Sequence, residues 1–473
     1  MLQVECYLLC YKRNWQGKEE LMACAFGQGA ATMDRWGRRY SPAPCIRATQ
    51  TTGIEKHLVR INSKVVMLTA CLWATWTAGA GAGSPLDGLL SDHQVRPPKD
   101  VARPDLHRSI IDPTFGTKIT RISDPSQVPG LRRLRHYYSK ADPFNADGSR
   151  AILFGNNGFA WLFDTHTWTP LNYLRITSGD PEIQWHPRDP NLFYYLDFSG
   201  NSPNVRAIMR YDIRSDGRTM LRDFVEYETA RGKLEGNMDR EGRHYALIGK
   251  RGKQREAFVY DVVNNTMSQK IEVTDKMADD WISVSPSGKY VVMMGGDRSR
   301  VYNIRMKLLH ELPKGSFGHA DLCLKADGSE AMVFDGADLE LDQNRNINMA
   351  DLATGKLSAL VRIGWGTTPH VSCRNLDLPG WALISTQGPD GKYPNHDFEI
   401  FWVKLDGSGE VRRVAHHHSS RKDGGYFAEQ HAVSNRSGTR IVFASNWGGE
   451  TVADYLIELP LNTGARTVGS EVK

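Results

Sequence analysis

The sequence predicts an all-β fold, because one short strand–turn–strand pattern recurs along most of the chain with hairpin-type turns inside it. The pattern occurs seven times from residue 117 onward, as "PFNADGSRAILF" (from 143), "IQWHPRDPNLFYYL" (183), "GNMDREGRHYALIG" (236), "ISVSPSGKYVVMM" (282), "LCLKADGSEAMVF" (322), "VSCRNLDLPGWALIS" (371) and "AVSNRSGTRIVFAS" (432). A spacing of roughly 40 to 60 residues is typical of four-stranded propeller blades. Asp-Gly or Ser-Gly between apolar runs is the expected hairpin chemistry. We therefore predict a seven-bladed β-propeller, with unpaired β-sandwich hairpins as the competing arrangement.

The end of the chain indicates how such a ring would close. The last repeat finishes with "DYLIELPL" and little follows, so its sheet needs a strand from elsewhere. The segment "TKITRISD" (117–124) precedes the first repeat and is the natural donor. Closure by this N-terminal strand leaves no open sheet edge. The predicted propeller domain spans 117–473.

The first 116 residues have a different character. Residues 58–83 place Arg60 and Lys64 before a short apolar run that ends in small residues, which is the layout of a signal peptide. Residues 1–57 then form a non-native N-terminal extension, and 84–116 form a linker. A buried apolar helix is the alternative for 58–83. We expect a secreted or periplasmic protein.

Composition excludes several classes of function. The chain of 473 residues is 40% hydrophobic and 24% charged, which is ordinary globular composition. Residues 1–83 hold ten Lys/Arg and five Asp/Glu of the totals of 59 and 54, so 49 of each remain and the net charge falls from +5 to zero. Bulk charge therefore gives no reason to expect a nucleic-acid partner. We also expect no membrane partner, and a monomer.

Histidines gather at the starts of several repeats, where the loops of a propeller converge on its axis. They include His136, His319, His370 and His431, with His416, His417 and His418 just before the last repeat. Only Cys323 and Cys373 lie beyond residue 83. Three His with one Cys suit structural zinc. The predicted ligands are His370, Cys373, His431 and one of His416 or His418, which share a strand face. Manganese or calcium is the alternative ion, and solvated loop histidines with a core Cys373 are the alternative interpretation.

Basic and aromatic residues indicate an anionic ligand. Arg132, Arg133 and Arg135 stand beside His136 in "LRRLRHYYSKADPF", a cluster suited to carboxylates. A second group falls on one predicted hairpin and comprises Tyr194, Tyr195, Arg206 and Arg210. A solvated basic loop and packing tyrosines are the alternatives. Together these residue types suit β-elimination on a uronic acid, in which Arg neutralises the carboxylate and His or Tyr moves the protons.

These segments resemble the secreted propeller polysaccharide lyases, namely the ulvan lyases and, more distantly, the oligogalacturonate lyases. The resemblance runs from about 117 to 460, through "HYYSKADPFNADGS", "GHADLCLKADGSE" and "AEQHAVSNRSGTRIVFASNWG". It implies His136, Tyr194 and Arg210 as catalytic residues, a structural zinc, and an anionic, ulvan-like polysaccharide as substrate. The residues expected to bind substrate are Arg135, Tyr138, Asn156, Asn157, Tyr195 and Arg206. Asn156 and Asn157 stand where the ulvan lyases tend to have a second active-site His, and an amide cannot act as a base.

Two other functions stay open. Oligogalacturonate lyases bind manganese through Gln and several His, and "EQH" supplies Gln430 and His431. A non-catalytic secreted propeller that binds carbohydrate or protein fits the absence of the second histidine.

Overall fold

The computed structural model describes residues 9–13, 19–23, 83–177, 180–199, 203–233, 235–336, 346–363, 367–388 and 396–460. The chain divides into two units, 1–76 and 77–473. In the first unit, β1 (Leu9–Arg13) pairs with β2 (Glu19–Ala23) in an antiparallel hairpin. Residues 58–82, almost all of the expected signal peptide, lie outside the described residues.

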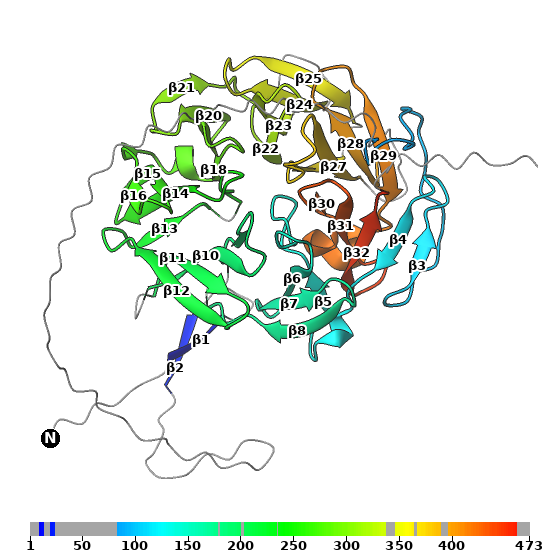
Figure 1. The fold of residues 1–473 in the computed structure, drawn as a ribbon, viewed down its shortest axis with the longest axis horizontal. Coiled ribbons are helices and arrows are strands. Elements are labelled where there is room, and N and C mark those ends of the chain that lie inside the picture. The colour runs from blue at the N-terminus through cyan, green and yellow to red at the C-terminus, as the bar shows by residue number, and fades with distance from the viewer. Residues whose placement is uncertain are drawn as a thin grey trace, which may run out of the picture. The chain divides into compact units, whose positions relative to one another are not determined.

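The second unit consists of small antiparallel sheets. Five of the seven sequence repeats begin sheets of their own, which follow one another around a common centre (Figure 1). They are β9 (Gln184–Trp185), β10 (Leu192–Phe198), β11 (Val205–Asp212) and β12 (Gly217–Asp223); β13 (Thr229–Arg231), β14 (His244–Arg251), β15 (Gln254–Asp261), β16 (Thr266–Met267) and β17 (Ile271–Glu272); β18 (Ile282–Val284), β19 (Tyr290–Gly295), β20 (Arg298–Asn303) and β21 (Leu308–Glu311); β22 (Ala320–Leu324), β23 (Glu330–Gly336), β24 (Asn346–Asp351) and β25 (Leu357–Arg362); and β26 (Thr368–Ser372), β27 (Trp381–Gln387), β28 (Glu399–Lys404) and β29 (Val411–His416).

The first and last repeats share one nine-stranded sheet. It contains β3 (Ser109–Ile111), β4 (Lys118–Arg121), β5 (Arg133–Arg135), β6 (Arg150–Gly155), β7 (Ala160–Asp164), β8 (Thr169–Tyr173), β30 (Val433–Ser434), β31 (Arg440–Ser445) and β32 (Val452–Glu458). Strand β4 lies within 117–124, the segment expected to complete the last sheet, and it pairs with β32 in antiparallel fashion. A short parallel contact between β32 and β5 joins the last repeat to the first.

Helix is almost absent from the described residues. The helical pieces there are α1 (Arg421–Gly424) and the 3₁₀ turns η1 (Pro125–Gln127), η2 (Lys276–Ala278) and η3 (Gly425–Ala428). Within the part of the chain that the structure describes, no helix is both long and apolar enough to cross a membrane.

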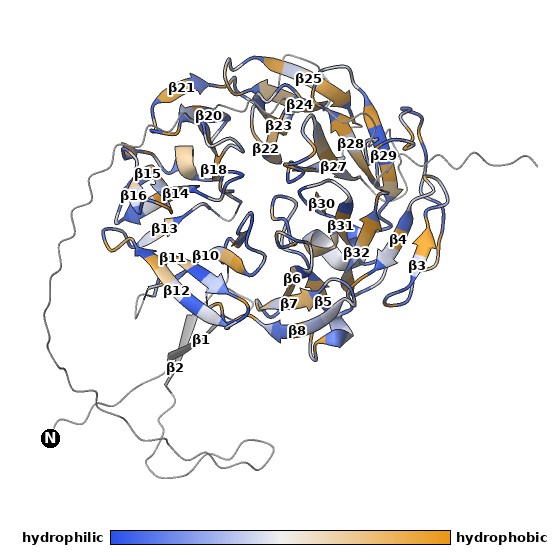
Figure 2. Cartoon of the chain, viewed as in Figure 1, coloured by the Kyte–Doolittle hydropathy of each residue, from blue (hydrophilic) through white to orange (hydrophobic). Residues whose placement is uncertain are grey.

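Turn chemistry and burial explain why the repeats form sheets. The tight turns before β6 and β23 contain Gly148 and Gly328, whose φ angles of 69° and 78° fall in the region that glycine adopts without strain. The outermost strands β8 and β12 are largely exposed and mostly hydrophilic (Figure 2). The apolar residues of the other strands pack between neighbouring sheets, so each core is shared by two repeats.

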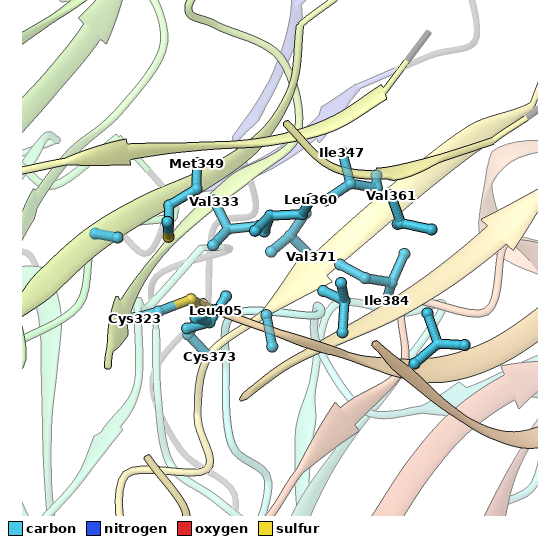
Figure 3. Packing of buried hydrophobic residues seen from close by; sticks show 14 of the residues in the cluster. Cys323, Val333, Ile347, Met349, Leu360, Val361, Val371, Cys373, Ile384 and Leu405 are labelled. Carbon is cyan, nitrogen blue, oxygen red and sulfur yellow. A yellow bond between two sulfur atoms is a disulfide. The ribbon is translucent and has the colours of Figure 1, made fainter. Parts of the chain in front are cut away.

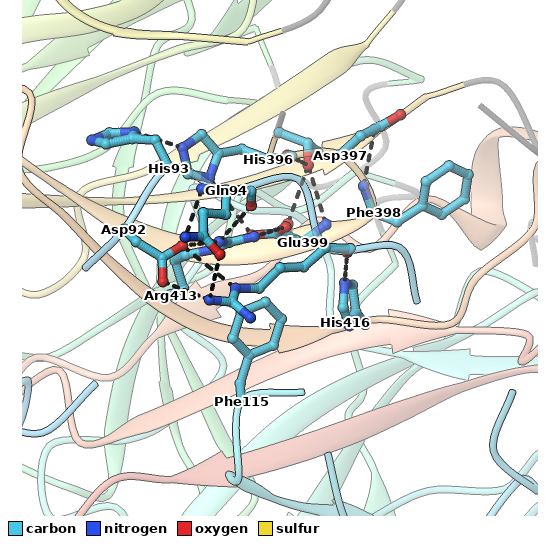
Figure 4. A network of polar contacts seen from close by, with 12 residues as sticks. Asp92, His93, Gln94, Phe115, His396, Asp397, Phe398, Glu399, Arg413 and His416 are labelled. Atoms are coloured by element: carbon cyan, nitrogen blue, oxygen red, sulfur yellow. Dashed lines mark hydrogen bonds and ion pairs between the residues drawn. The ribbon is translucent and has the colours of Figure 1, made fainter. Parts of the chain in front are cut away.

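Residues 84–116, for which only a linker was expected, contact two sheets: β3 pairs with β4, and residues 84–96 pack on the sheet β26–β29. Leu86 is buried, and Leu90 forms a β-bridge with Arg413 of β29. Arg413 binds Glu399 and also Asp92 of this segment (Figure 4). Residues 84–96, here called the strap, therefore belong to the folded unit.

Candidate active site

Three buried side chains converge where the inner strands of the last two repeats begin. His370 lies on β26, and Glu429 and His431 lie just before β30. Nε2 of His370 is 3.4 Å from Oε2 of Glu429, and Nε2 of His431 is 3.8 Å from the same oxygen. All three ligand atoms lie within 4.8 Å of one another. This spacing suits one metal ion with ligand bonds of about 2 Å.

Several polar atoms of this group lack hydrogen-bond partners. Both ring nitrogens of His370, Nε2 of His431 and the side-chain amide of the adjacent Gln430 are buried, and within the described residues they have no hydrogen-bond partner. Buried polar groups normally have one. Burial lowers the pKa of His370 and of His431 well below the usual value, so both rings are neutral, which is the form that binds metals. The group therefore fits a divalent cation.

Arg135 and His136 hold the segment that carries two of these ligands. The Arg135 guanidinium donates to the carbonyls of His136, Phe427 and Glu429 and contacts Nδ1 of His431. A metal at Nε2 of His431 requires the proton on Nδ1, so this last contact must lengthen when an ion binds. The three carbonyls still hold the guanidinium in place.

The ring of His136 is fully engaged. Its Nδ1 lies 2.8 Å from Oδ1 of Asp454, and its Nε2 lies 2.7 Å from the carbonyl oxygen of His431. Both partners are acceptors, so both contacts are satisfied only when each nitrogen carries a proton. No lone pair is then left to take a proton from a substrate. In this structure His136 positions the His431 backbone.

Four further side chains border the metal group. The Tyr138 ring centroid is 4.8 Å from that of His431, and the His319 ring centroid is 4.4 Å from that of His370. Lys140 is buried, forms an ion pair with Glu235 and lies over the ring of Trp281. Half-exposed Tyr426 also faces His431. Burial raises the pKa of Tyr138 well above its usual value, so its hydroxyl is a proton donor rather than a base.

Cys373 is not a metal ligand, which corrects the predicted zinc site. Its sulfur forms a disulfide with Cys323 of the preceding repeat, inside the core between β22–β25 and β26–β29 (Figure 3). Without a thiolate, the reason for preferring zinc over manganese is gone. The two cysteines occupy matching positions in consecutive repeats, and this signal in the sequence could have revealed the pair.

His416 and His418 also lie outside the metal group. His416 ends β29, the fourth strand from the centre, and three strand spacings place it about 14 Å from β26. Its Nε2 meets the carbonyl oxygen of Arg96 in the strap. The ring of His418 stacks on Trp447 at 4.4 Å. Both residues serve the packing of the outer strands.

The expected hairpin tyrosines and arginines form part of a sheet. Tyr194 on β10 lies opposite Arg210 on β11, as the hairpin pattern predicted. Tyr194 belongs to the core shared with the next sheet, and its ring meets His186. Tyr195 is fully buried among aromatic rings, and Arg206 pairs with Asp223 at 3.0 Å. The two tyrosines therefore pack in cores, Arg206 forms an ion pair, and Arg210 is exposed.

Asn156 and Asn157 cap a turn. Oδ1 of Asn156 accepts the backbone N–H groups of Arg132 and Arg133, and Oδ1 of Asn157 accepts that of Phe159. Of the residues expected to bind substrate, Tyr138 and Arg135 are the two at the metal group. Sequence reasoning missed the ligand Glu429, although it stands two residues before His431, and gave no role to His319 or Lys140.

The antiparallel sheets and the inner-strand site define an all-β protein of propeller-like architecture. No protein-family model matches the sequence, and no curated protein matches it. Among solved structures, the chain is similar to an oligogalacturonate lyase in complex with manganese, with 17% identity and a TM-score of 0.53 over 76% of this chain and 97% of that one. It is also similar to an oligogalacturonate lyase from Vibrio parahaemolyticus, with 15% identity and a TM-score of 0.52 over 75% and 96% of the two chains. At these identities the similarity is one of fold.

Proposed function

We propose that this chain is a metal-dependent lyase that cleaves a uronate-containing oligosaccharide or polysaccharide by β-elimination. The observation that carries the proposal is the buried group of His370, Glu429 and His431, whose ligand atoms lie within 4.8 Å of one another and include unpartnered ring nitrogens. The fold similarity to two oligogalacturonate lyases supports a galacturonate-type substrate over the ulvan expected from the sequence.

The fold that we propose for this function is the seven-bladed, ring-closed propeller. The nine-stranded sheet then comprises two blades, β5–β8 and β30–β32 with β4, in contact through β32 and β5. The pairing of β4 with β32 supports closure by the N-terminal strand.

The donor set limits the choice of metal. Two histidines and one carboxylate are ligands that manganese and zinc both accept. The neighbouring Gln430 adds an oxygen donor that is buried and unpartnered, and oxygen donors favour the harder manganese ion. We therefore propose manganese as the resident ion.

The chemistry divides between the ion and the surrounding side chains. A divalent ion bound at this group would neutralise the uronate carboxylate and so acidify the proton on C5. His319 is placed to take this proton, because one third of its side chain is exposed beside His370. Lys140, held near the site by Glu235, is placed to protonate the departing glycosidic oxygen. Tyr138, whose ring contacts those of His370 and His431, would position the sugar ring.

The disulfide supports a location outside the cytoplasm. Disulfides persist in oxidising compartments, and Cys323 and Cys373 are paired. We propose a secreted or periplasmic enzyme.

The test is to load the purified protein with manganese and follow ultraviolet absorption by the unsaturated uronate product, with oligogalacturonates, ulvan and alginate as substrates. A rise with oligogalacturonates supports the proposal. His319→Gln should abolish turnover and keep the metal, and loss of the metal in this variant would make His319 a ligand instead of the base. A flat trace from folded, metal-loaded protein would leave a binding propeller as the better interpretation.

A further inference from the structure

A groove lined by charged residues lies near the metal group. It has a volume of about 420 Å³ and is bordered by β13, β14, β15 and the turn that follows η2. Its cationic lining consists of Arg231, Lys233, Lys250 and Arg255. All four residues are half-buried, so neighbouring residues of the groove cover part of each side chain.

Three of these four cations have no ion pair within the described residues, and the carboxylates of Glu235, Asp279 and Asp280 line the same groove. Arg255 pairs with Asp275. Arg231, Lys233 and Lys250 have no ion pair in the part of the chain that the structure describes. The neighbouring Arg251, by contrast, donates a hydrogen bond to Gln254. Half-buried cations without a counterion favour an anionic ligand.

Side-chain contacts connect the groove to the metal group. Glu235 lines the groove and forms the ion pair with Lys140, whose ammonium is 4.4 Å from the centroid of the Trp281 ring and 5.9 Å from that of Tyr138. The Tyr138 ring in turn lies against His431. One row of contacts thus leads from the metal group through Tyr138 and Lys140 into the groove.

The acidic residues of the lining suit the other groups of a sugar. Asp279 and Asp280 also line the groove, and Oδ1 of Asp279 accepts the backbone N–H of Gly296. Carboxylates accept hydrogen bonds from sugar hydroxyls, while the cations bind sugar carboxylates. A uronate unit carries both kinds of group.

We propose that this groove is a second uronate subsite, which binds a further unit of the oligosaccharide whose reacting unit lies at the metal group. This inference rests on the proposed function and deepens it. It makes the chain selective for substrates longer than the disaccharide, because only these reach Arg231 and Lys233.

The test compares kcat/KM for digalacturonate and tetragalacturonate in the wild type and in an Arg231→Gln, Lys233→Gln double variant. In the wild type, kcat/KM should be higher for the tetramer than for the dimer. In the double variant this ratio should fall about tenfold, mainly because KM for the tetramer rises. The cause is the removal of charge-assisted hydrogen bonds. The control is Lys253→Gln, an exposed residue in the β14–β15 turn outside the groove, which should keep the wild-type ratio. Equal losses on both substrates, or an unchanged ratio, would overturn the subsite.

Calorimetry separates this inference from the proposed reaction. If the wild type cleaves neither substrate, the lyase proposal fails, and binding of tetragalacturonate to the manganese-loaded protein still tests the groove. Weaker binding in the double variant but not in Lys253→Gln supports the subsite. Equal binding in all three proteins overturns it.

Discussion

Nε2 of His370 lies 3.4 Å from Oε2 of Glu429, although His370 is on β26 and Glu429 belongs to the segment before β30. The guanidinium of Arg421 pairs with the other oxygen of Glu429, whereas both ring nitrogens of His370 lack a hydrogen-bond partner within the described residues. A divalent ion between His370 and Glu429 would bind both groups, and this arrangement leads to the first prediction.

Replacement of Glu429 by Gln should weaken metal binding at least tenfold, because an anionic ligand is lost while the shape of the side chain is kept. Equilibrium dialysis against manganese, followed by elemental analysis, measures the change. Exposed Glu450→Gln is the matched control and should bind the ion as the wild type does. Unchanged binding in Glu429→Gln would remove Glu429 from the ligand set.

The disulfide should stabilise the fold without contributing to the metal site. Replacing both Cys323 and Cys373 by Ala should lower the free energy of unfolding by about 4 kcal/mol, since the bond closes a loop with a sequence separation of 50. Urea denaturation measures this loss, and elemental analysis should find the metal content unchanged. Loss of the metal from the folded double variant would restore Cys373 as a ligand.

The sequence predicted the sheets better than it predicted the site, and the cause is physical. Strand and turn patterns are local, so residues such as Gly148 mark the repeats by themselves. The strand period placed His416 and His418 on one face, although β29 ends at His416 and the other two histidines lie beyond it. The period could not show that β29 is an outer strand, or that His416 contacts the strap and His418 stacks on Trp447. Contacts between repeats depend on how the sheets pack, so the sequence around each residue does not indicate them. The hydrogen bond from Arg135 to the carbonyl of Glu429 is an example.

His417 should make the fold less stable in mild acid. Its Nε2 donates to the carbonyl of Thr386, its Nδ1 accepts from the backbone N–H of Ser419, and burial lowers its pKa to about 3. An unfolded histidine has a pKa of about 6.5. Between these values only the unfolded chain takes up the proton, so stability falls as the pH falls below about 6.5 and has dropped by about 2 kcal/mol at pH 5.

Urea denaturation at pH 7.5 and at pH 5 tests this contribution. In His417→Gln, the difference in unfolding free energy between the two pH values should be about 2 kcal/mol smaller than in the wild type. His166→Gln, at a side chain that is 75% exposed, should retain the wild-type difference. The same difference in all three proteins would show that His417 is not the titrating group.

Arg413 should anchor the strap more strongly than its partner Asp92 does. Its side chain is fully buried, binds Glu399 and also reaches Oδ1 of Asp92 and the carbonyl of Gln94 at 2.8 Å each (Figure 4). Arg413→Met leaves the buried Glu399 charge uncompensated and should lower the free energy of unfolding by about 3–5 kcal/mol. Asp92→Asn changes a partner that is 33% exposed and should cost below about 1 kcal/mol.

The double variant Arg413→Met with Glu399→Gln identifies the cause of the loss. If the cost comes from the unpaired carboxylate, neutralising Glu399 should recover most of the stability, because replacing both partners of a buried ion pair is far milder than removing one. Chemical denaturation of the two single variants and the double variant, analysed as a cycle, measures the coupling. A double variant no more stable than Arg413→Met would show instead that the strap is held by the hydrogen bonds from Arg413 to Gln94 and Asp92, and that the ion pair with Glu399 contributes little.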